Sequence, residues 1–216
     1  MEHAELTRKI DAYLEENWET MVEDIETLVR IPSFEESDKA TEGAPFGPGP
    51  KEALEAALEM ASDMGFKTHD AEGYIGLADF PGKIDTKLGI IGHMDVVPAG
   101  PGWNFEPYAV TRKEGYLVGR GTLDDKGPSV LCLYALKFLK EHNVPLKYGV
   151  RALLGANEET GMEDVEYYLK NYPAPDFCFS PDAEFPVCNG EKGGFNGYLV
   201  SKKLENGNIL EFTGGV

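Results

Sequence analysis

Apolar residues at the start of the chain recur every three or four positions. The pattern runs over residues 6–29 and stops before Pro32, which is typical of one long amphipathic helix. Residues 33–50 are polar and rich in Gly and Pro, so they predict a loop. The helical spacing returns over residues 51–65 and predicts a second helix that ends at Gly65.

Two kinds of strand pattern follow the second helix. Half-buried strands are expected over residues 66–74 and 75–80. Continuous apolar runs are expected of strands that are covered on both faces. These runs occupy residues 87–95, 148–159 and 176–182.

Helical patterns separate the covered strands. Residues 128–142 are apolar nearly all round and predict a buried helix with Pro128 in its first turn, and residues 163–172 predict a short helix. Such alternation predicts an α/β domain whose sheet is mixed but mainly parallel, with helices on both faces.

The last residues read as a hairpin. Residues 198–212 hold two strand patterns around Asn206-Gly207, a strong signal for a two-residue turn. Because an isolated hairpin is only marginally stable in water, we expect the chain to be the N-terminal part of a longer protein.

Composition excludes some classes of function. The 216 residues are 42% hydrophobic, which is enough for one α/β domain with a sizeable core. The formal net charge is −18, with 38 acidic against 20 basic residues, which argues against a nucleic-acid partner or an anionic membrane surface. This charge is compatible with a protein that binds cations.

The cysteines and the N-terminus point to the cytoplasm. Cys132, Cys178 and Cys188 show no CxxC spacing, and two of them lie in apolar stretches, so reduced, packed thiols are expected. The N-terminus lacks the apolar core of a signal peptide, and no window approaches the roughly 18 apolar residues of a membrane span.

Acidic residues and one histidine follow the covered strands and precede the buried helix. They are His93, Asp95, Asp124, Asp125, Glu158, Glu159 and Asp182. Ligands of open α/β sheets bind beyond the carboxyl ends of the strands, so we expect these side chains to converge there. Because so many clustered carboxylates repel one another unless a cation lies among them, the pattern predicts a metal site.

The residue types and their spacing suggest roles. Imidazole and carboxylate ligands without a thiolate favour Zn²⁺, Mn²⁺ or Co²⁺. Residues two apart on a strand point the same way, so Asp95 can accept the ring N–H of His93 and leave the other nitrogen for a metal. Adjacent residues point oppositely, so one of Glu158 and Glu159 can face a metal while the other acts as a general base.

Other polar and aromatic residues fit structural roles. Asp125 is expected to accept hydrogen bonds from turn amides, and Lys126 and Arg120 are expected to be surface charges. Three aromatic residues are expected to pack a Pro/Gly loop, with a substrate pocket as the alternative: Trp103, Phe105 and Tyr108. The remaining histidines, His3, His69 and His142, are expected to be structural.

Four motifs carry a family resemblance. In order they are GHMDVVPAGPGW, GRGTLDDKGP, NEETG and SPDAEFP. They resemble the two-zinc dipeptidases of the family that also holds carnosinase, aminoacylase and glutamate carboxypeptidase, most of all the bacterial Xaa-His dipeptidase branch. The resemblance covers essentially the whole chain and implies a zinc-peptidase-like catalytic domain. Residues 1–200 would be the N-terminal part of that domain, and residues 201–216 a hairpin leading into an inserted lid domain that is missing.

The resemblance also implies a role for each site residue. His93 and Asp182 would bind the first metal, Asp124 would bridge both metals, and Glu159 would bind the second. Glu158 would be the general base and Asp95 would orient His93. A non-proline cis peptide bond after Asp124 is implied, and an Asp at position 182 favours dipeptides with a free N-terminal amine as substrates.

One departure limits what this chain is expected to do. The family's second metal takes a histidine from a late segment, and a lid grips the substrate, and neither can be found in this sequence. We therefore expect two zinc ions in the full-length enzyme but one, or weak occupancy, here, with little activity. Two alternatives stay open, a non-catalytic metal-binding or interaction fragment and a two-metal phosphoesterase, although no basic residues are placed to hold a phosphate.

Overall fold

The computed structural model describes residues 3–183, 186–190 and 193, without the side chains of residues 3, 85 and 86. Contacts divide the chain into two units, Met1–Ala183 and Glu184–Val216, and the helices and strands described here belong to the first. The hairpin expected over residues 198–212 lies outside the described residues. The domain division at residue 200 therefore stays a prediction.

The helices form where the apolar spacing predicts them. They are α1 (His3–Val29), α2 (Pro48–Asp63), α3 (Lys126–Glu141) and α4 (Glu163–Asn171), with a short 3-10 helix at Ser37–Lys39. Gly65 follows α2 with a φ of 80°, a conformation that glycine adopts without strain. Although α1 has 27 residues, no helix in the described part of the chain is long and apolar enough to cross a membrane.

Five strands form the main sheet in the order β1-β2-β6-β3-β7. Their bounds are Lys67–Ala71 (β1), Ile75–Phe80 (β2), Ile84–His93 (β3), Tyr148–Gly155 (β6) and Phe177–Phe179 (β7). β3 is parallel to β6 and β7, whereas β2 is antiparallel to β1 and β6, so the sheet is mixed. A separate hairpin of β4 (Thr111–Lys113) and β5 (Tyr116–Val118) was not predicted.

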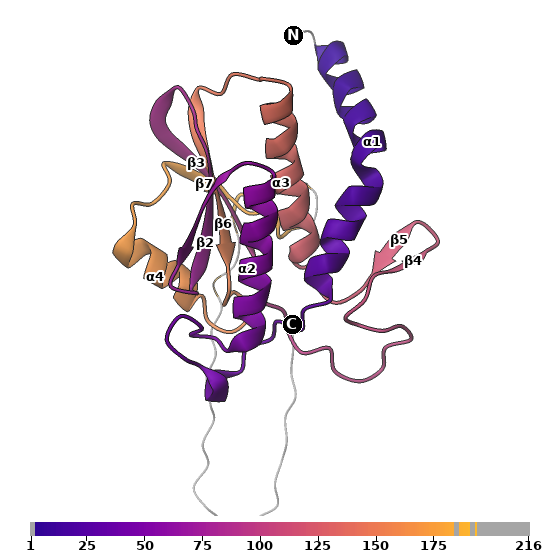
Figure 1. Ribbon diagram of the computed structural model, residues 1–216, viewed down its shortest axis with the longest axis vertical. Coiled ribbons are helices and arrows are strands. Elements are labelled where there is room, and N and C mark those ends of the chain that lie inside the picture. The colour runs from indigo at the N-terminus through magenta and orange to yellow at the C-terminus, as the bar shows by residue number, and fades with distance from the viewer. Residues whose placement is uncertain (1–2, 184–185, 191–192, 194–216) are drawn as a thin grey trace, which may run out of the picture. The chain divides into compact units, whose positions relative to one another are not determined.

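Helices cover both faces of this sheet, as predicted (Figure 1). Ala152 and Leu154 of β6 belong to a large apolar cluster that includes residues of α1, α2 and α3. Leu153 between them points to the other face and joins a smaller cluster with Tyr168 of α4. Burial on both faces explains why β6 reads as a continuous apolar run.

Two expectations about the third covered strand are wrong. Phe177 and Phe179 of β7 are 66% and 43% exposed, because this three-residue strand lies at the edge of the described sheet and pairs only with β3 there. Cys178 is therefore exposed rather than packed, and Cys188 is exposed as well. No cysteine forms a disulfide, as expected.

Candidate metal centre

The carboxyl ends of β3 and β6 lie level with each other, since His93 is in register with Gly155. β3 ends at His93, two residues before the end of the predicted strand, and Asp95 follows it. β6 ends at Gly155, however, so Glu158 and Glu159 lie in a turn and not on the strand itself. Their directions are therefore set by the contacts of that turn and not by the alternation of a strand.

Two glycines at these strand ends give room to buried carboxylates. A Cβ at Gly92 would lie 2.4 Å from Oδ2 of Asp125, and a Cβ at Gly155 would lie 2.4 Å from Oδ2 of Asp164. A side chain at either position would displace the carboxylate. The two glycines thus allow acidic side chains to approach the backbone directly beside the site.

His93 is 2% exposed and has a carboxylate on each side of its ring. Its Nε2 lies 3.0 Å from Oδ1 of Asp124, 3.5 Å from Oδ2 of Asp182 and 3.9 Å from Oε2 of Glu158. Its Nδ1 lies 3.0 Å from the backbone oxygen of Asp95 and 3.3 Å from that residue's Oδ1. The structure therefore brings together residues from four separate segments of the chain.

These side chains make two overlapping groups that could hold a metal ion. One consists of His93, Asp124 and Glu159, and the other of His93, Glu158 and Asp182. Within each group the potential ligand atoms all lie within 4.8 Å of one another. Nitrogen and oxygen donors without sulfur match the preferences of Zn²⁺ and Mn²⁺.

The electrostatics of the cluster favour a cation. Burial lowers the pKa of the His93 imidazole, but neighbouring carboxylates, led by Asp95, outweigh it and raise that pKa to about 10. Burial raises the pKa of Glu158 and Glu159, and nearby carboxylates add to this effect. Among the described residues no lysine or arginine forms an ion pair with this cluster. The residues present therefore fit a bound metal ion.

Asp95 also holds the turn that carries the two glutamates. Its Oδ1 accepts the backbone N–H of Glu158 at 3.1 Å, and its Oδ2 accepts that of Glu159 at 3.0 Å. Oε1 of Glu159 in turn accepts the N–H of Val97 at 3.3 Å. One carboxylate thus contacts both the His93 ring and the backbone of the glutamate turn.

Asp125 is a hydrogen-bond acceptor, as expected, but its partners lie at the end of β3 and in α3 and are not turn amides. Its Oδ2 accepts the backbone N–H of His93 at 3.2 Å and the hydroxyl of Ser129 at 3.0 Å. Burial raises the pKa of Asp125 to about 7. The peptide bond between Asp124 and Asp125 is cis, as the family resemblance implies.

Lys126 is not the surface charge that the sequence suggested. Its side chain is fully buried, and its Nζ donates to the backbone oxygens of Leu28 and Ile31, both at 2.8 Å. The Leu28 carbonyl, in the last turn of α1, also accepts the N–H of Ile31 at 3.1 Å, and Ile31 lies just beyond the helix, so Lys126 ties down the end of α1. Burial lowers the pKa of Lys126 to about 7.

Arg120 is partly buried and stacks on an aromatic residue. Its guanidinium carbon lies 5.4 Å from the ring centre of Trp103. The indole N–H of Trp103 donates to the backbone oxygen of Ala99 at 2.8 Å, and the Tyr108 hydroxyl accepts from the Ala99 N–H at 3.2 Å. The Lys113 amine lies over the ring of Phe105, 5.3 Å from the ring centre. Trp103 and Tyr108 thus pack against their own loop, as expected, whereas Phe105 packs against Lys113 of β4.

Two of the other histidines have structural contacts, as expected. His69 Nε2 lies 2.9 Å from the Tyr172 hydroxyl, and His142 Nδ1 lies 3.0 Å from the backbone oxygen of Phe138. Neither belongs to a group that could hold a metal. The side chain of His3 is outside the description.

Sequence reasoning missed two acidic residues beside the centre. Asp164 is 1% exposed, and its Oδ2 accepts the N–H groups of Ala156 at 2.8 Å and Asn157 at 3.1 Å. Glu35 accepts hydrogen bonds from the side chains of Asn157 and Thr160. The NEETG motif was therefore recognised, but not the residues that hold it, because an acid in a helical turn or a polar loop carries no distinguishing pattern.

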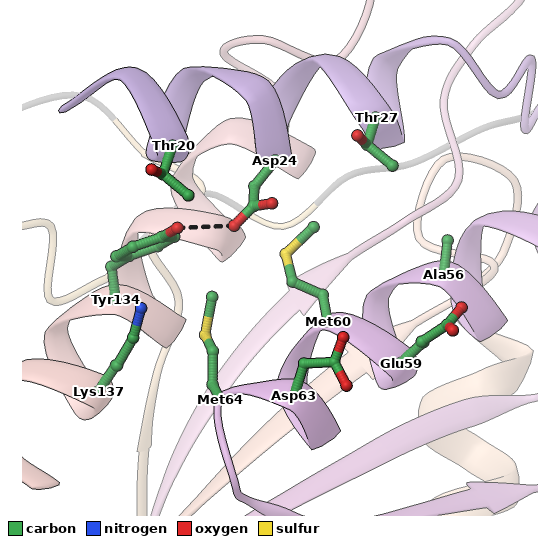
Figure 2. Close-up of a pocket in the computed structure, with 10 residues that line it drawn as sticks. All are labelled: Thr20, Asp24, Thr27, Ala56, Glu59, Met60, Asp63, Met64, Tyr134 and Lys137. Atoms are coloured by element: carbon green, nitrogen blue, oxygen red, sulfur yellow. Dashed lines mark hydrogen bonds between the residues drawn. The ribbon is translucent and has the colours of Figure 1, made fainter. Parts of the chain in front are cut away.

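Two hollows in the described chain contain none of the predicted metal ligands. One, of about 320 Å³, lies between α1, α2 and α3, and Figure 2 shows the Tyr134 hydroxyl donating to Asp24 there, at 2.7 Å. The other, of about 480 Å³, is lined by Lys67, Lys83 and Lys87. The metal centre is thus recognised from its side chains and not from a cavity.

Comparisons with known proteins agree with this geometry. The chain is 46% identical to a Beta-Ala-Xaa dipeptidase of Lactobacillus delbrueckii subsp. lactis over 82% of its length, and it spans 38% of that protein. Human carnosine dipeptidase 1 superimposes with a TM-score of 0.64 at 21% identity, covering 76% of this chain and 37% of that one. A dinuclear metal-binding peptidase of Bacillus subtilis superimposes with a TM-score of 0.54 at 15% identity, covering 79% and 43%.

The match to a family extends through the segment that carries the site. A sequence profile described as peptidase family M20/M25/M40 matches residues 89–201, which include His93, Asp124, Glu159 and Asp182. The profile covers more than half of the chain, and the solved structures show the same fold. The chain therefore belongs to peptidase family M20/M25/M40.

Proposed function

We propose that this chain is part of a metal-dependent dipeptidase. The observation that carries the proposal is the position of His93, whose Nε2 lies within 4 Å of three carboxylates that no lysine or arginine of the described chain neutralises. The name of the Lactobacillus relative supports dipeptides with a free N-terminal amine as the substrate class. Because the chain spans 38% of that relative, the activity is proposed for the full-length protein.

The two groups share His93 and include Glu158, so the division between two ions follows the family resemblance and not the groups alone. We assign His93 and Asp182 to a first ion and Glu159 to a second, with Asp124 between them. Zn²⁺ is the proposed metal, with Mn²⁺ or Co²⁺ as alternatives, and this chain is proposed to hold one ion or to bind weakly. When bound, the metal would polarise the peptide carbonyl and lower the pKa of water.

Glu158 is the proposed general base. Its Oε2 lies 3.9 Å from His93 Nε2, and its pKa is raised by burial, which suits a group that must accept a proton near neutral pH. The Glu158 carboxylate would take a proton from the attacking water and pass it to the leaving amine. Asp95 would keep His93 and the glutamate turn aligned through its contacts with both.

Hydrolysis of a β-alanyl dipeptide by the full-length protein tests the proposal. Removal of metal by a chelator should abolish hydrolysis, and Zn²⁺, Mn²⁺ or Co²⁺ should restore it. Glu158→Gln should lower kcat by about 10²-fold or more, because the amide cannot accept the proton. The matched control Glu163→Gln removes the same charge from an exposed residue and should leave kcat unchanged.

The substrate class has its own control. The same dipeptide with an acetylated N-terminus should not be hydrolysed if a free amine is required. Equal rates for Glu158→Gln and the unmodified enzyme would refute the assignment of the base. Hydrolysis that survives complete metal removal would refute the metal-dependent mechanism.

A further inference from the structure

Glu35 lies far from the metal centre in sequence but touches the turn that carries its two glutamates. Its Oε2 accepts a hydrogen bond from Nδ2 of Asn157 at 3.2 Å and another from the hydroxyl of Thr160. Its Oε1 accepts the hydroxyl of Ser37 at 2.5 Å. The carboxylate of Glu35 therefore joins the loop after α1 to both ends of the glutamate turn.

The same loop also holds the segment around Asp95. The hydroxyl of Ser33 donates to the backbone oxygen of Met94 at 2.6 Å, and the Ser33 carbonyl accepts the N–H of Val96 at 3.1 Å. Ser33 is fully buried. Residues 33–35 thus contact both segments that face each other across the centre.

We propose that Glu35 is a positioning residue for the metal centre, which fixes Glu158 and Glu159 through Asn157 and Thr160. This inference rests on the proposed function, because it assigns those two glutamates to the site. Glu35 touches no proposed metal ligand directly and would act through its two hydrogen-bond partners. It also lies outside residues 89–201, the part of the chain that the family profile matches.

The other contacts of the turn do not replace those of Glu35. Asp95 and Asp164 accept backbone N–H groups and fix the path of the main chain. Glu35 accepts from side chains instead, and one of these, Thr160, directly follows Glu159. Nδ2 of Asn157 also donates to Oγ1 of Thr160 at 2.5 Å, but Asn157 is 3% exposed, so water cannot readily replace Glu35 as its second acceptor.

Four variants of this chain separate hydrogen bonding from charge and from general stability. Glu35→Ala removes the acceptor, and Glu35→Gln keeps one oxygen for Asn157 and Thr160 and can donate its NH₂ to Ser37. Thr160→Val removes the hydroxyl that donates to Glu35 and that also accepts from Nδ2 of Asn157 at 2.5 Å. Glu36→Ala is the matched control, since this neighbouring acid pairs instead with Lys39 at 2.6 Å.

Two readouts apply to each variant. Titration with Co²⁺, followed by its visible absorption, gives the dissociation constant and reports the ligand geometry. Hydrogen exchange of the Glu158 and Glu159 amides in the metal-free chain reports the order of the turn without any metal. The melting temperature shows whether each variant is folded.

Glu35→Ala should weaken Co²⁺ binding about tenfold, the low end of the loss seen for direct partners of metal ligands, because Glu35 acts one bond further out, and it should alter the absorption band. Its Glu158 and Glu159 amides should exchange about tenfold faster. Thr160→Val should shift both readouts in the same direction, whereas Glu35→Gln and Glu36→Ala should stay within about twofold of the unmodified chain.

The outcomes separate this inference from the proposed function. Unchanged affinity and exchange in folded Glu35→Ala would overturn the positioning role while leaving the metal centre intact. A loss in Glu35→Gln as large as in Glu35→Ala would overturn it too, because charge and not hydrogen bonding would then be responsible. If the unmodified chain bound no Co²⁺, the metal centre would fail, and the exchange rates alone would still decide the role of Glu35.

Discussion

Acidic side chains are paired with an arginine near one end of the main sheet but, among the described residues, with no lysine or arginine at the other. Toward the end where β3 and β6 begin, Arg151 pairs with Asp79 through two hydrogen bonds of 2.8 and 2.7 Å and also donates to the Tyr168 hydroxyl. At the carboxyl end, acidic groups surround His93 without a lysine or arginine ion pair in the described chain. The described chain thus balances its charges at the first end, whereas the carboxylates at the second end suit an external cation.

This contrast separates a structural ion pair from a binding site. Both places contain a partly buried carboxylate beside a basic group, and sequence spacing alone would not tell them apart. The two places differ in the number of carboxylates per basic group. Arg151 has one carboxylate partner, Asp79, whereas His93 has several carboxylates within 4 Å. Perturbed groups of this kind are candidates for function because excess charge of one sign needs a ligand.

Metal addition should produce the largest difference between the two ends. Zn²⁺ at about a thousand times its dissociation constant should raise the free energy of unfolding by about 4 kcal/mol, because it binds only the folded chain. Urea unfolding with Zn²⁺ and with a chelator measures this change. The double variant Asp124→Asn/Asp182→Asn should lose the increase, and Asp79→Asn should keep it. If Zn²⁺ stabilised Asp124→Asn/Asp182→Asn as much as the unmodified chain, the ion would bind elsewhere.

Loss of the balancing cation at the other end should be the next largest effect. Arg151→Met should lower the free energy of unfolding by about 3 kcal/mol, because Asp79 is left partly buried without its partner. In the double variant Asp79→Asn/Arg151→Met the loss should be smaller than the sum of the single losses. A loss no greater than for Arg30→Met, in an exposed pair, would mean that the Arg151 pair contributes little.

Lowering the pH should remove part of the stability that the Asp79–Arg151 pair contributes. Burial raises the pKa of Asp79, but its hydrogen bonds and attraction to Arg151 outweigh this and lower that pKa. A lowered pKa gives stability that is complete above the unfolded value of about 4 and is lost as pH falls through the folded value. The unmodified chain should lose this stability below about pH 4, and Arg151→Met should show a smaller loss in the same titration.

The smallest expected effect is an increase, not a decrease, in the free energy of unfolding. In the metal-free chain Glu158→Gln should raise the free energy of unfolding by about 0.5 kcal/mol, because it removes one of several repelling, partly solvated carboxylates. Urea unfolding in the presence of chelator measures it, with Glu42→Gln, in an exposed loop, as the control. Destabilisation by Glu158→Gln would show that this carboxylate is already balanced within the chain.

The positions of the site residues could largely be predicted from sequence. Covered strands read as apolar runs, and the carboxyl ends of parallel strands meet, so the grouping of His93 with Glu158 and Asp182 followed from the pattern. The directions of Glu158 and Glu159 did not follow, because β6 ends before them. Strand periodicity carries no information beyond the last residue of the strand.

The residues that support the site could not be predicted. Glu35 reaches a turn more than 120 positions away from a loop without apolar periodicity, and such a contact leaves no local signal. Lys126 looked like a surface charge because sequence gives no sign that the end of α1 lies beside it. The exposure of β7 was missed for the converse reason, since an edge strand can carry the same apolar residues as a central one.

The burial of Lys126 gives the fold a chemical reporter. The amine of Lys126 is fully buried against the carbonyls at the end of α1, out of reach of an acylating reagent. Labelling at this one lysine would thus require α1 and α3 to separate, while the exposed lysines react at once. The rate at which the Lys126 peptide becomes labelled, measured by mass spectrometry, would then report how often α1 and α3 separate.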